Sequence, residues 1–199
     1  MITHIWAAVA ALAVLALPAA AAAAPISYRA FLDGPSEEPP NTSPGTGSAR
    51  LVIDTEADFY RLTFSFEGLL AGTTAVHIHG PTLLPFEGTA SVMTTTPSFP
   101  GFPAGVTSGT YGNTFDTTAV VTWNPSFVTS VGDSIANAEA AFAAALADGK
   151  AYLNIHTSAF PSGEIRGFFT PAPAPIPIPA GLPLLATGLV AFAALRRRA

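Results

Sequence analysis

The segment FYRLTFSF, Phe59–Phe66, alternates large apolar residues with mostly polar ones along its whole length. Successive side chains of a β-strand point to opposite faces, so this alternation separates the residues into two sets. The apolar set is Tyr60, Leu62, Phe64 and Phe66, and the polar set is Arg61, Thr63 and Ser65. The segment is therefore predicted to be a strand with Phe64 and Phe66 in the core and Arg61 on the solvent face.

Similar patterns on both sides of this segment predict an antiparallel sheet. Further strands are expected at residues 27–34, 49–54, 73–80, 119–123, 151–157 and 164–170. The polar turn TEAD, Thr55–Asp58, joins the second of these to Phe59–Phe66 as a hairpin. Many short strands between turn-rich connections favour an all-β fold, an antiparallel β-sandwich of immunoglobulin-like or Greek-key type with one short helix.

The helix is predicted from composition. Residues Ile135–Ala147 read IANAEAAFAAALA, and alanine has the highest helix propensity of all residues. Either Asp133 or Ser134 is suited to be the N-cap, because a short polar side chain accepts a bond from a free N–H of the first turn. Asp148-Gly149 is expected to end the helix.

Residues 81–118 are rich in Thr, Pro, Gly and Ser and show only weak strand signals near residues 90–93. Such a composition favours loops and turns. We expect a solvated insertion here. The alternative is that its aromatic residues Phe99, Phe102 and Tyr111 form a binding edge.

The ends of the chain differ from the body at residues 25–170. Residues 1–24 combine an apolar run with an alanine tract, which is the pattern of a secretory signal peptide. Residues 171–179 read PAPAPIPIP, an extended proline-rich spacer. Residues 180–199 form an apolar segment with an arginine-rich end, typical of an anchor helix whose basic end stays in the cytoplasm. We therefore expect the body to be exported.

The segment IPIPAGLPLL, Ile176–Leu185, with the apolar run and the arginines that follow it, resembles the PEP-CTERM class of bacterial sorting signals. It is most similar to the VPLPA-CTERM variant. The resemblance implies a Gram-negative bacterium and an exosortase-type membrane protease as processing partner, with transient anchoring in the inner membrane. It also implies a final location in the periplasm, on the outer surface or in the extracellular matrix. A plain membrane anchor is the alternative.

The body is strongly acidic. Three of the eight basic residues are Arg196–Arg198, which leaves five in the body against all thirteen acidic residues, a net charge of −8. Such a charge argues against binding to nucleic acid or to an anionic membrane surface. The chain has no cysteine, so disulfides and thiolate metal sites are excluded.

Three histidines lie in two of the expected strands. VHIHGP, Val76–Pro81, contains His77 and His79, and NIHT, Asn154–Thr157, contains His156. The period of two places these imidazoles on the outward faces of their strands, opposite Val76 and Ile78. Imidazoles on neighbouring strands are a ligand set that zinc and copper accept.

Glu164, across a short turn from His156, is expected to provide an oxygen ligand or to hold a histidine ring in place. Protonation of the histidines below their reference pKa of about 6.5 would compete with the metal. The alternative is a structural polar face. In that case the histidines hydrogen-bond to backbone carbonyls or loops, and Glu164 and Arg166 tie the last strand to its partner.

Three blocks of the body resemble the signature blocks of the chordin-type CHRD domain. They are TTAVHIHGP at residues 73–81, ALADGKAYLNIHT at 145–157 and FPSGEIRGFF at 160–169. The resemblance extends over about Ile26–Phe169. It places His77, His79, His156, Glu164 and Arg166 at the family's recurring polar positions. It implies a β-sandwich domain of extracellular proteins, including bacterial ones, and brings no established catalytic activity.

Three functional hypotheses follow. The first is a non-enzymatic interaction module for a cell-surface or matrix polymer, with or without one bound metal ion. The second is a mononuclear zinc or copper metalloprotein with oxidoreductase-like activity, because three histidines are too few for the dinuclear site of Cu/Zn superoxide dismutase. The third is a carbohydrate-binding module in which Trp123 or Tyr111 stacks on sugars, although the apolar run before Trp123 predicts that it lies in the core.

Overall fold

The computed structural model describes residues 24–173. The strands are β1 (Ile26–Asp33), β2 (Thr46–Asp54), β3 (Phe59–Glu67), β4 (Thr73–His79), β5 (Gly109–Asp116), β6 (Tyr152–Thr157), β7 (Ile165–Phe168) and β8 (Thr170–Pro171). The helices are the 3-10 helix η1 (Val120–Thr122), α1 (Pro125–Ser130) and α2 (Ile135–Ala147).

The predictions for the two ends fall almost entirely outside the described residues. These are the signal peptide at 1–24, most of the spacer at 171–179 and the anchor at 180–199. Within residues 24–173, no helix has the length and apolar character needed to span a membrane.

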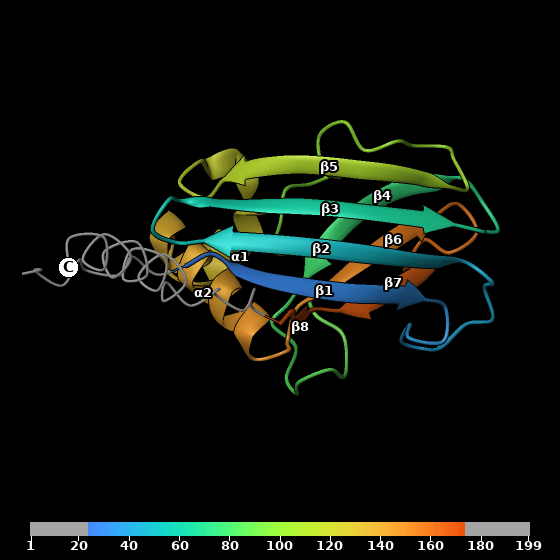
Figure 1. The fold of residues 1–199 in the computed structure, drawn as a ribbon, viewed down its shortest axis with the longest axis horizontal. Coiled ribbons are helices and arrows are strands. Elements are labelled where there is room, and N and C mark those ends of the chain that lie inside the picture. The colour runs from blue at the N-terminus through green and yellow to red at the C-terminus, as the bar shows by residue number, and fades with distance from the viewer. Residues whose placement is uncertain (1–23, 174–199) are drawn as a thin grey trace, which may run out of the picture.

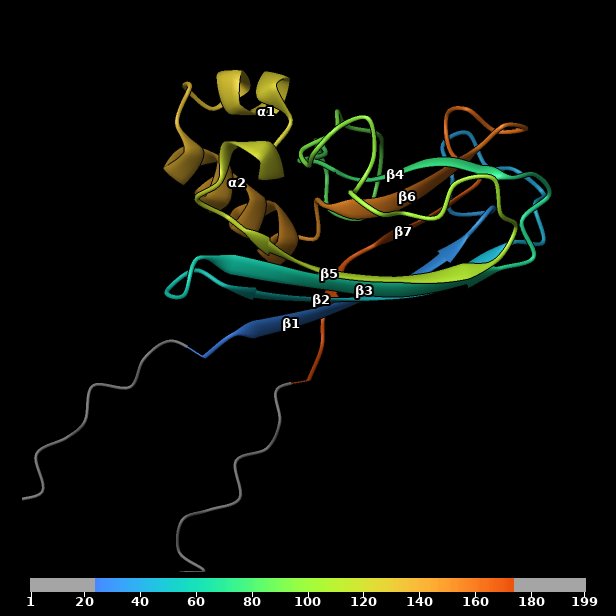
Figure 2. The ribbon, with the colours of Figure 1, turned by 90° about the horizontal axis from the view of Figure 1, so that it is seen from above.

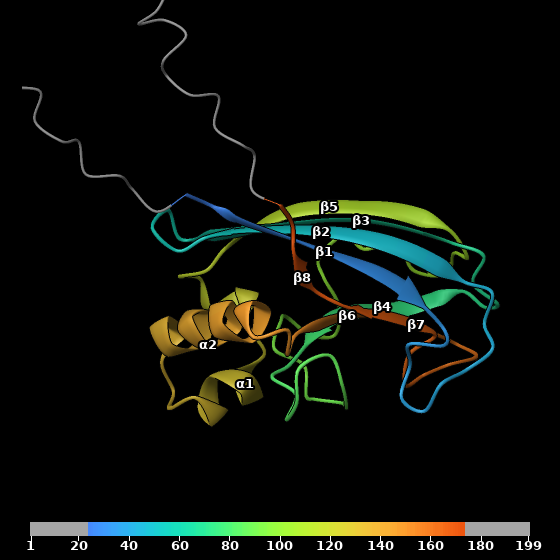
Figure 3. The same ribbon diagram turned by 60° about the horizontal axis from the view of Figure 1, so that its bottom comes forward.

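All eight strands belong to one antiparallel sheet, in the order β4-β6-β7-β1-β2-β3-β5, with β8 also paired to β1 (Figure 1). The sheet curls so that β4-β6-β7 faces β1-β2-β3-β5, and the two layers enclose the core (Figures 2 and 3). Asp33 of β1 pairs with Arg166 of β7 where the layers join. The prediction of an all-β, antiparallel, sandwich-like fold is confirmed.

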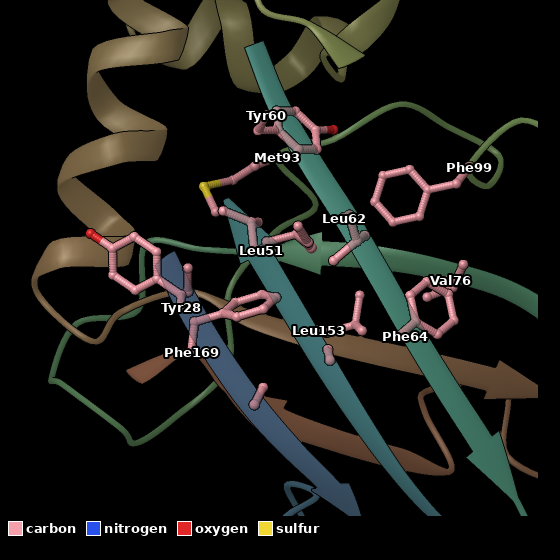
Figure 4. Packing of buried hydrophobic residues seen from close by; sticks show 14 of the residues in the cluster. Tyr28, Leu51, Tyr60, Leu62, Phe64, Val76, Met93, Phe99, Leu153 and Phe169 are labelled. Atoms are coloured by element: carbon pink, nitrogen blue, oxygen red, sulfur yellow. The ribbon is translucent and has the colours of Figure 1, made fainter. Parts of the chain in front are cut away.

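Both layers contribute large apolar side chains to the core (Figure 4). Leu51 and Leu62 come from one layer and Val76 and Leu153 from the other, and none of the four is exposed. Tyr60 stacks on Phe115 with ring centroids 4.7 Å apart. Phe64 and Phe66 are buried and Arg61 is exposed, so the predicted orientation of β3 is confirmed. Trp123 is also buried, as predicted.

Helix α2 closes one end of the sandwich and directs the fully buried Phe142 inward. Its N-cap is Ser134, whose hydroxyl accepts a bond from the Asn137 N–H. Gly149, with φ +67°, follows the end of the helix, as predicted. A further helix, α1, begins after Asn124, whose side chain accepts from the Ser126 N–H. The Asn124-Pro125 pair is a helix-start signal that the sequence prediction missed.

Two local predictions were wrong. Residues 119–123 do not form the predicted strand: Val120–Thr122 form η1, and the Thr122 hydroxyl donates to the Asp116 carbonyl to hold this turn. The predicted solvated insertion at 81–118 contains strand β5, which pairs with β3 along its full length. Phe99, Tyr111 and Phe115 of this segment are buried, so the segment supplies core residues. The glycines and polar residues of β5 hid its strand pattern.

Candidate metal centre

Strands β4 and β6 place the three histidines on one face. Val76 and Ile78 of β4 point into the core and are fully buried, so His77 and His79 point to the opposite face. His77 pairs with Asn154 of β6, which puts His156 diagonally across the ladder from His77. The side chains of the three histidines converge because the sheet is antiparallel and this register is kept without interruption from Ala75 to His79.

The three imidazole rings form a nearly equilateral triangle. The ring centroids of His77 and His79 are 5.7 Å apart, those of His77 and His156 5.3 Å, and those of His79 and His156 5.7 Å. One ring nitrogen from each residue lies within 4.8 Å of the other two. In tetrahedral zinc with bonds of about 2.0 Å, neighbouring ligand atoms are about 3.3 Å apart, so modest ring rotations would complete a site.

Each ring makes one hydrogen bond to a backbone carbonyl. The partners are Pro97 for His77 Nε2 at 2.7 Å, Ala90 for His79 Nδ1 at 2.9 Å and Pro161 for His156 Nδ1 at 3.0 Å. A carbonyl oxygen only accepts, so each of these ring nitrogens is the donor. The other nitrogen of each neutral ring must then carry a lone pair.

Those remaining nitrogens are His77 Nδ1, His79 Nε2 and His156 Nε2. All three are buried, and none has a hydrogen-bond partner among residues 24–173. Metal-binding histidines characteristically donate their second ring N–H to a carbonyl or carboxylate, which fixes the tautomer and aims the lone pair. The hydrogen-bonding pattern of the cluster is the one that such ligands have.

The face that carries the cluster is not open to solvent, which corrects the prediction of outward histidines on a polar surface. His77 is 8% exposed and His79 is 9% exposed, whereas His156 is partly exposed. Residues 90–98 lie along β4, where the Met93 N–H donates to the Ile78 carbonyl and the Ile78 N–H donates to the Thr94 hydroxyl. The same segment brings the Ala90 and Pro97 carbonyls to the rings.

Burial lowers the pKa of all three histidines, because a poorly solvated site disfavours the charged imidazolium. The pKa of His79 falls to about 4, and the positive charges of His156, His77 and Arg166 add to the effect of burial. The pKa values of His77 and His156 are lowered mainly by the same loss of solvation. The rings are therefore neutral at neutral pH, which is the protonation state that binds a metal.

An aromatic and cationic layer supports the cluster. The sequence analysis named Arg166 among the recurring polar positions but gave it no role at the metal site. The Tyr152 ring stacks on His79 at 5.1 Å and 10°. The Arg166 guanidinium lies over the Tyr152 ring, 4.9 Å from its centroid. Arg166 also donates to the Ser36 and Gly88 carbonyls, which fixes its position. The alternation of β6 and β7 would have placed Tyr152 and Arg166 on the same face as the histidines.

Glu164 is the one predicted site residue that the structure keeps apart from the cluster. It is fully buried, and its carboxylate accepts bonds from the Ser43 hydroxyl, the Leu70 N–H and the Thr157 hydroxyl, each at 2.6 Å. It is absent from the group of neighbouring ligand atoms that the three histidines form in the described chain. Glu164 therefore joins two loops to β6, and both of its oxygens are engaged in hydrogen bonds there.

Glycine is required at Gly163, beside Glu164. Its φ of +136° is outside the range that other residues adopt readily. A Cβ atom there would lie 2.4 Å from Asn154 Oδ1 and 2.6 Å from Glu37 Oε1. The block FPSGEIRGFF thus contains the turn after which β7 runs back along β6. It also contains the Glu164 carboxylate, which anchors this turn.

Comparison with known proteins agrees with this structural pattern. The CHRD domain family matches residues 28–169, which is more than half of the chain. No curated protein and no solved structure matches in the corresponding comparisons. The matched residues run from β1 through β7 and include the three histidines and the buried Glu164. The chain belongs to the CHRD domain family.

Proposed function

We propose that this CHRD domain binds one zinc or copper ion through His77, His79 and His156 and acts as a non-enzymatic interaction module of the cell surface or matrix. The single observation that carries the metal site is the set of three buried imidazole nitrogens without a partner among the described residues. Leaving one buried polar atom unpaired costs about 1–3 kcal/mol, so three adjacent ones need a physical reason. A shared cation supplies it.

The structural-face hypothesis accounts for only half of the ring nitrogens. It explains the bonds to the Pro97, Ala90 and Pro161 carbonyls. It gives no reason for the convergence of the three opposite nitrogens. A metal ion explains both sets, since the carbonyl bonds orient the lone pairs that bind it. Neutral imidazole suits both zinc and copper, so the ligand type alone does not select between them.

Export and sorting are part of the same proposal and rest on the sequence of the two ends. The signal-like residues 1–24 and the tail at 180–199 support a protein that passes the inner membrane and is processed by an exosortase-type protease. We place the body in the periplasm, on the outer surface or in the extracellular matrix. The partner is a surface or matrix polymer.

A second candidate function is oxidoreductase-like chemistry at a mononuclear copper site. It is favoured by the count of three protein ligands, since metal sites with three protein ligands retain a position for water or substrate. Of the three proposed ligands only His156 is partly exposed, although its free nitrogen Nε2 is buried. Ascorbate oxidation or superoxide removal by the copper-loaded protein, absent from the His77→Asn/His79→Asn variant, would support this function.

The test of the metal site is metal content and thermal stability of the full chain, purified without added metal and after treatment with a chelator. We expect about one equivalent of zinc or copper to rebind and to raise the melting temperature at pH 7.5. The His77→Asn/His79→Asn variant should lose this effect. Arg61→Gln is the control, because this exposed side chain lies on β3 in the other layer and its loss removes no ligand. Equal metal responses of all three proteins would refute the site.

A further inference from the structure

Two buried oxygen atoms outside the histidine cluster also lack hydrogen-bond partners. They are Glu37 Oε1 and Asn154 Oδ1, and neither has a partner among residues 24–173. Glu37 lies in the loop between β1 and β2 and is 6% exposed, and Asn154 lies on β6 and is 3% exposed. An unpaired buried polar atom lowers stability, so the two oxygens together need a donor.

Both oxygens border the same small space beside Gly163. A Cβ atom built on this glycine would lie 2.4 Å from Asn154 Oδ1 and 2.6 Å from Glu37 Oε1. The Asn154 Nδ2 group donates to the Ser162 carbonyl at 3.3 Å, so Oδ1 is the unpaired end of the amide. Gly163 belongs to the turn between β6 and β7, which lies at the same end of the sandwich as the β1–β2 loop (Figures 2 and 3).

The neighbouring side chains do not supply this donor. The Arg166 guanidinium donates to two backbone carbonyls, and the carboxylate within 4.0 Å of it is that of Glu38, at 3.7 Å. The Tyr152 hydroxyl is bonded to backbone atoms of another segment. An ionised Glu37 and the Asn154 oxygen only accept hydrogen bonds, so they cannot satisfy each other.

A proton is the donor that fits this space. The loop and the turn line a hollow of about 340 Å³, formed by residues 37–41 and 159–163. Both oxygens are buried, so a hydrated metal ion or an amine in the hollow cannot contact them unless the loop moves. A protonated Glu37 has one O–H donor, and a single bond from Oε1–H to Asn154 Oδ1 pairs both oxygens.

Burial of Glu37 favours its protonated form. It raises the pKa of this carboxyl group to about 7, because a poorly solvated site disfavours the charge. The positive charge of Arg166 and the Glu38 N–H lower the pKa and are outweighed. Tyr152 also interacts electrostatically with Glu37, and burial raises the pKa of its hydroxyl, so this neighbour stays neutral.

We propose that Glu37 is protonated in the folded protein and donates to Asn154 Oδ1, which fastens the β1–β2 loop to the β6–β7 turn as a proton latch. Loss of the proton leaves a buried charge next to an acceptor oxygen. The loop and the turn then separate, and water from the hollow reaches both oxygens. The latch is therefore closed in mildly acidic surroundings and opens as the pH rises past neutral.

The latch does not rest on the proposed metal site, because neither Glu37 nor Asn154 is one of its ligands. The same turn carries the Pro161 carbonyl that bonds to His156. Burial lowers the pKa of His156 from 6.5, so protonation of this ring acts below that pH, whereas the latch opens at higher pH. Failure of the latch would leave the histidine site unaffected, and histidine variants that lack the metal should keep the latch.

Amide hydrogen exchange of the full chain, in non-ionic detergent with a chelator, tests the latch locally. The Gly163 N–H donates to the Phe160 carbonyl in the turn, and the Asn41 N–H donates to the Gly34 carbonyl in the loop. After correction for intrinsic exchange, the opening equilibrium at both amides should rise at least about tenfold from pH 5 to pH 8. A local readout is needed because protonation of Glu37 and of the histidines affects global stability with opposite signs.

The Glu37→Gln variant should abolish this rise, because its amide group donates to Asn154 at every pH. At pH 8 its opening equilibrium should be at least about tenfold smaller than that of the original protein. Glu38→Gln is the matched control, because this neighbouring side chain is 53% exposed and its change should leave the rise in place.

Carbon-13 NMR of the Glu37 carboxyl group detects the proton directly and needs no variant. We expect a pKa near 7, against an ordinary value of 4.5. Titration near 4.5 would overturn the proposal, since the carboxylate would then accept from a reversed Asn154 amide. An unchanged rise in Glu37→Gln would overturn it as well, and slower exchange at pH 8 on addition of calcium would identify a cation in place of the proton.

Discussion

His156 of β6 lies diagonally across the ladder from His77 of β4, and their ring centroids are 5.3 Å apart. The directly opposite position is occupied by Asn154, so the contact depends on side chains leaning along the strands. A slip of one residue in this register would turn His156 to the other face of the sheet. The candidate metal centre is therefore a direct consequence of the β4–β6 pairing.

Metal binding should persist to lower pH than free histidine would allow. The reference pKa of about 6.5 predicts that protons displace the metal near pH 6. Burial lowers the pKa of all three ligands, and that of His79 to about 4. We expect the metal-dependent rise in melting temperature to remain at pH 5.5 and to disappear near pH 4. Its loss between pH 7 and 6 would contradict the buried, neutral cluster.

The metal-free protein should lose stability as pH falls from about 6.5 to about 4. His79 binds a proton more readily in the unfolded chain than in the folded one, because its pKa is lowered on folding. The contribution of His79 to the free energy of unfolding is complete above the pKa of the unfolded state. It is lost as the pH falls to the pKa of the folded state, on the order of 3 kcal/mol in total. Urea unfolding in the presence of a chelator measures this, and His79→Asn should flatten the dependence.

Phe64→Ala should lower the free energy of unfolding by roughly 3–5 kcal/mol. The Phe64 ring is buried and lies 5.2 Å from the Tyr111 ring and 5.9 Å from the Phe102 ring, centroid to centroid. Arg61→Ala, on the exposed face of the same strand, is the control and should cost less than about 1 kcal/mol. Denaturant unfolding that gave equal losses would be inconsistent with the observed faces of β3.

Glu164→Gln should destabilise the fold and leave metal affinity nearly unchanged. The carboxylate accepts three short hydrogen bonds, and an amide places donors where acceptors are needed. We expect a loss of roughly 3 kcal/mol in the free energy of unfolding. Calorimetric titration with zinc should show an affinity within about threefold of the original, as long as the variant is folded. A much larger loss of zinc affinity would indicate that Glu164 is a ligand of the metal.

Gly163→Ala should be more damaging than Gly88→Ala. Both glycines have positive φ, +136° and +80° respectively, so either substitution strains the backbone. Only at Gly163 would the new methyl group meet other atoms, the Asn154 amide and Glu37, whereas nothing lies within 4 Å at Gly88. The expected difference is at least about 2 kcal/mol, read from denaturant unfolding of the two variants.

The mature protein should lack Arg196–Arg198 if the tail is a sorting signal. Processing by an exosortase-type protease would remove this arginine cluster with the apolar run that precedes it. Intact-mass analysis of protein from the cell surface and the medium measures the C-terminus directly. Retention of the arginines on all of the exported protein would favour a plain anchor.

Strand β3 shows which part of the fold could be predicted from sequence. Its alternation of residues such as Leu62 and Arg61 reports directly which side chains face the core, because the period of two is local. Strand β5 could not be found in the same way. Gly109 and Gly112 interrupt its pattern, and its stability comes from pairing with β3, far away in the chain. Helix α1 carried a local signal in Asn124-Pro125 that was overlooked.

The sequence by itself determined that His77, His79 and His156 would point away from the core, because the alternation of side chains between the two faces of a strand depends only on neighbouring residues. Only the tertiary structure decided what surrounds them. It brings the Ala90 and Pro97 carbonyls from a segment with only weak strand signals, and it engages Glu164 with Ser43 and Leu70 instead of a metal. These contacts join residues distant in the chain, so they depend on strand register and loop packing, which no local pattern encodes.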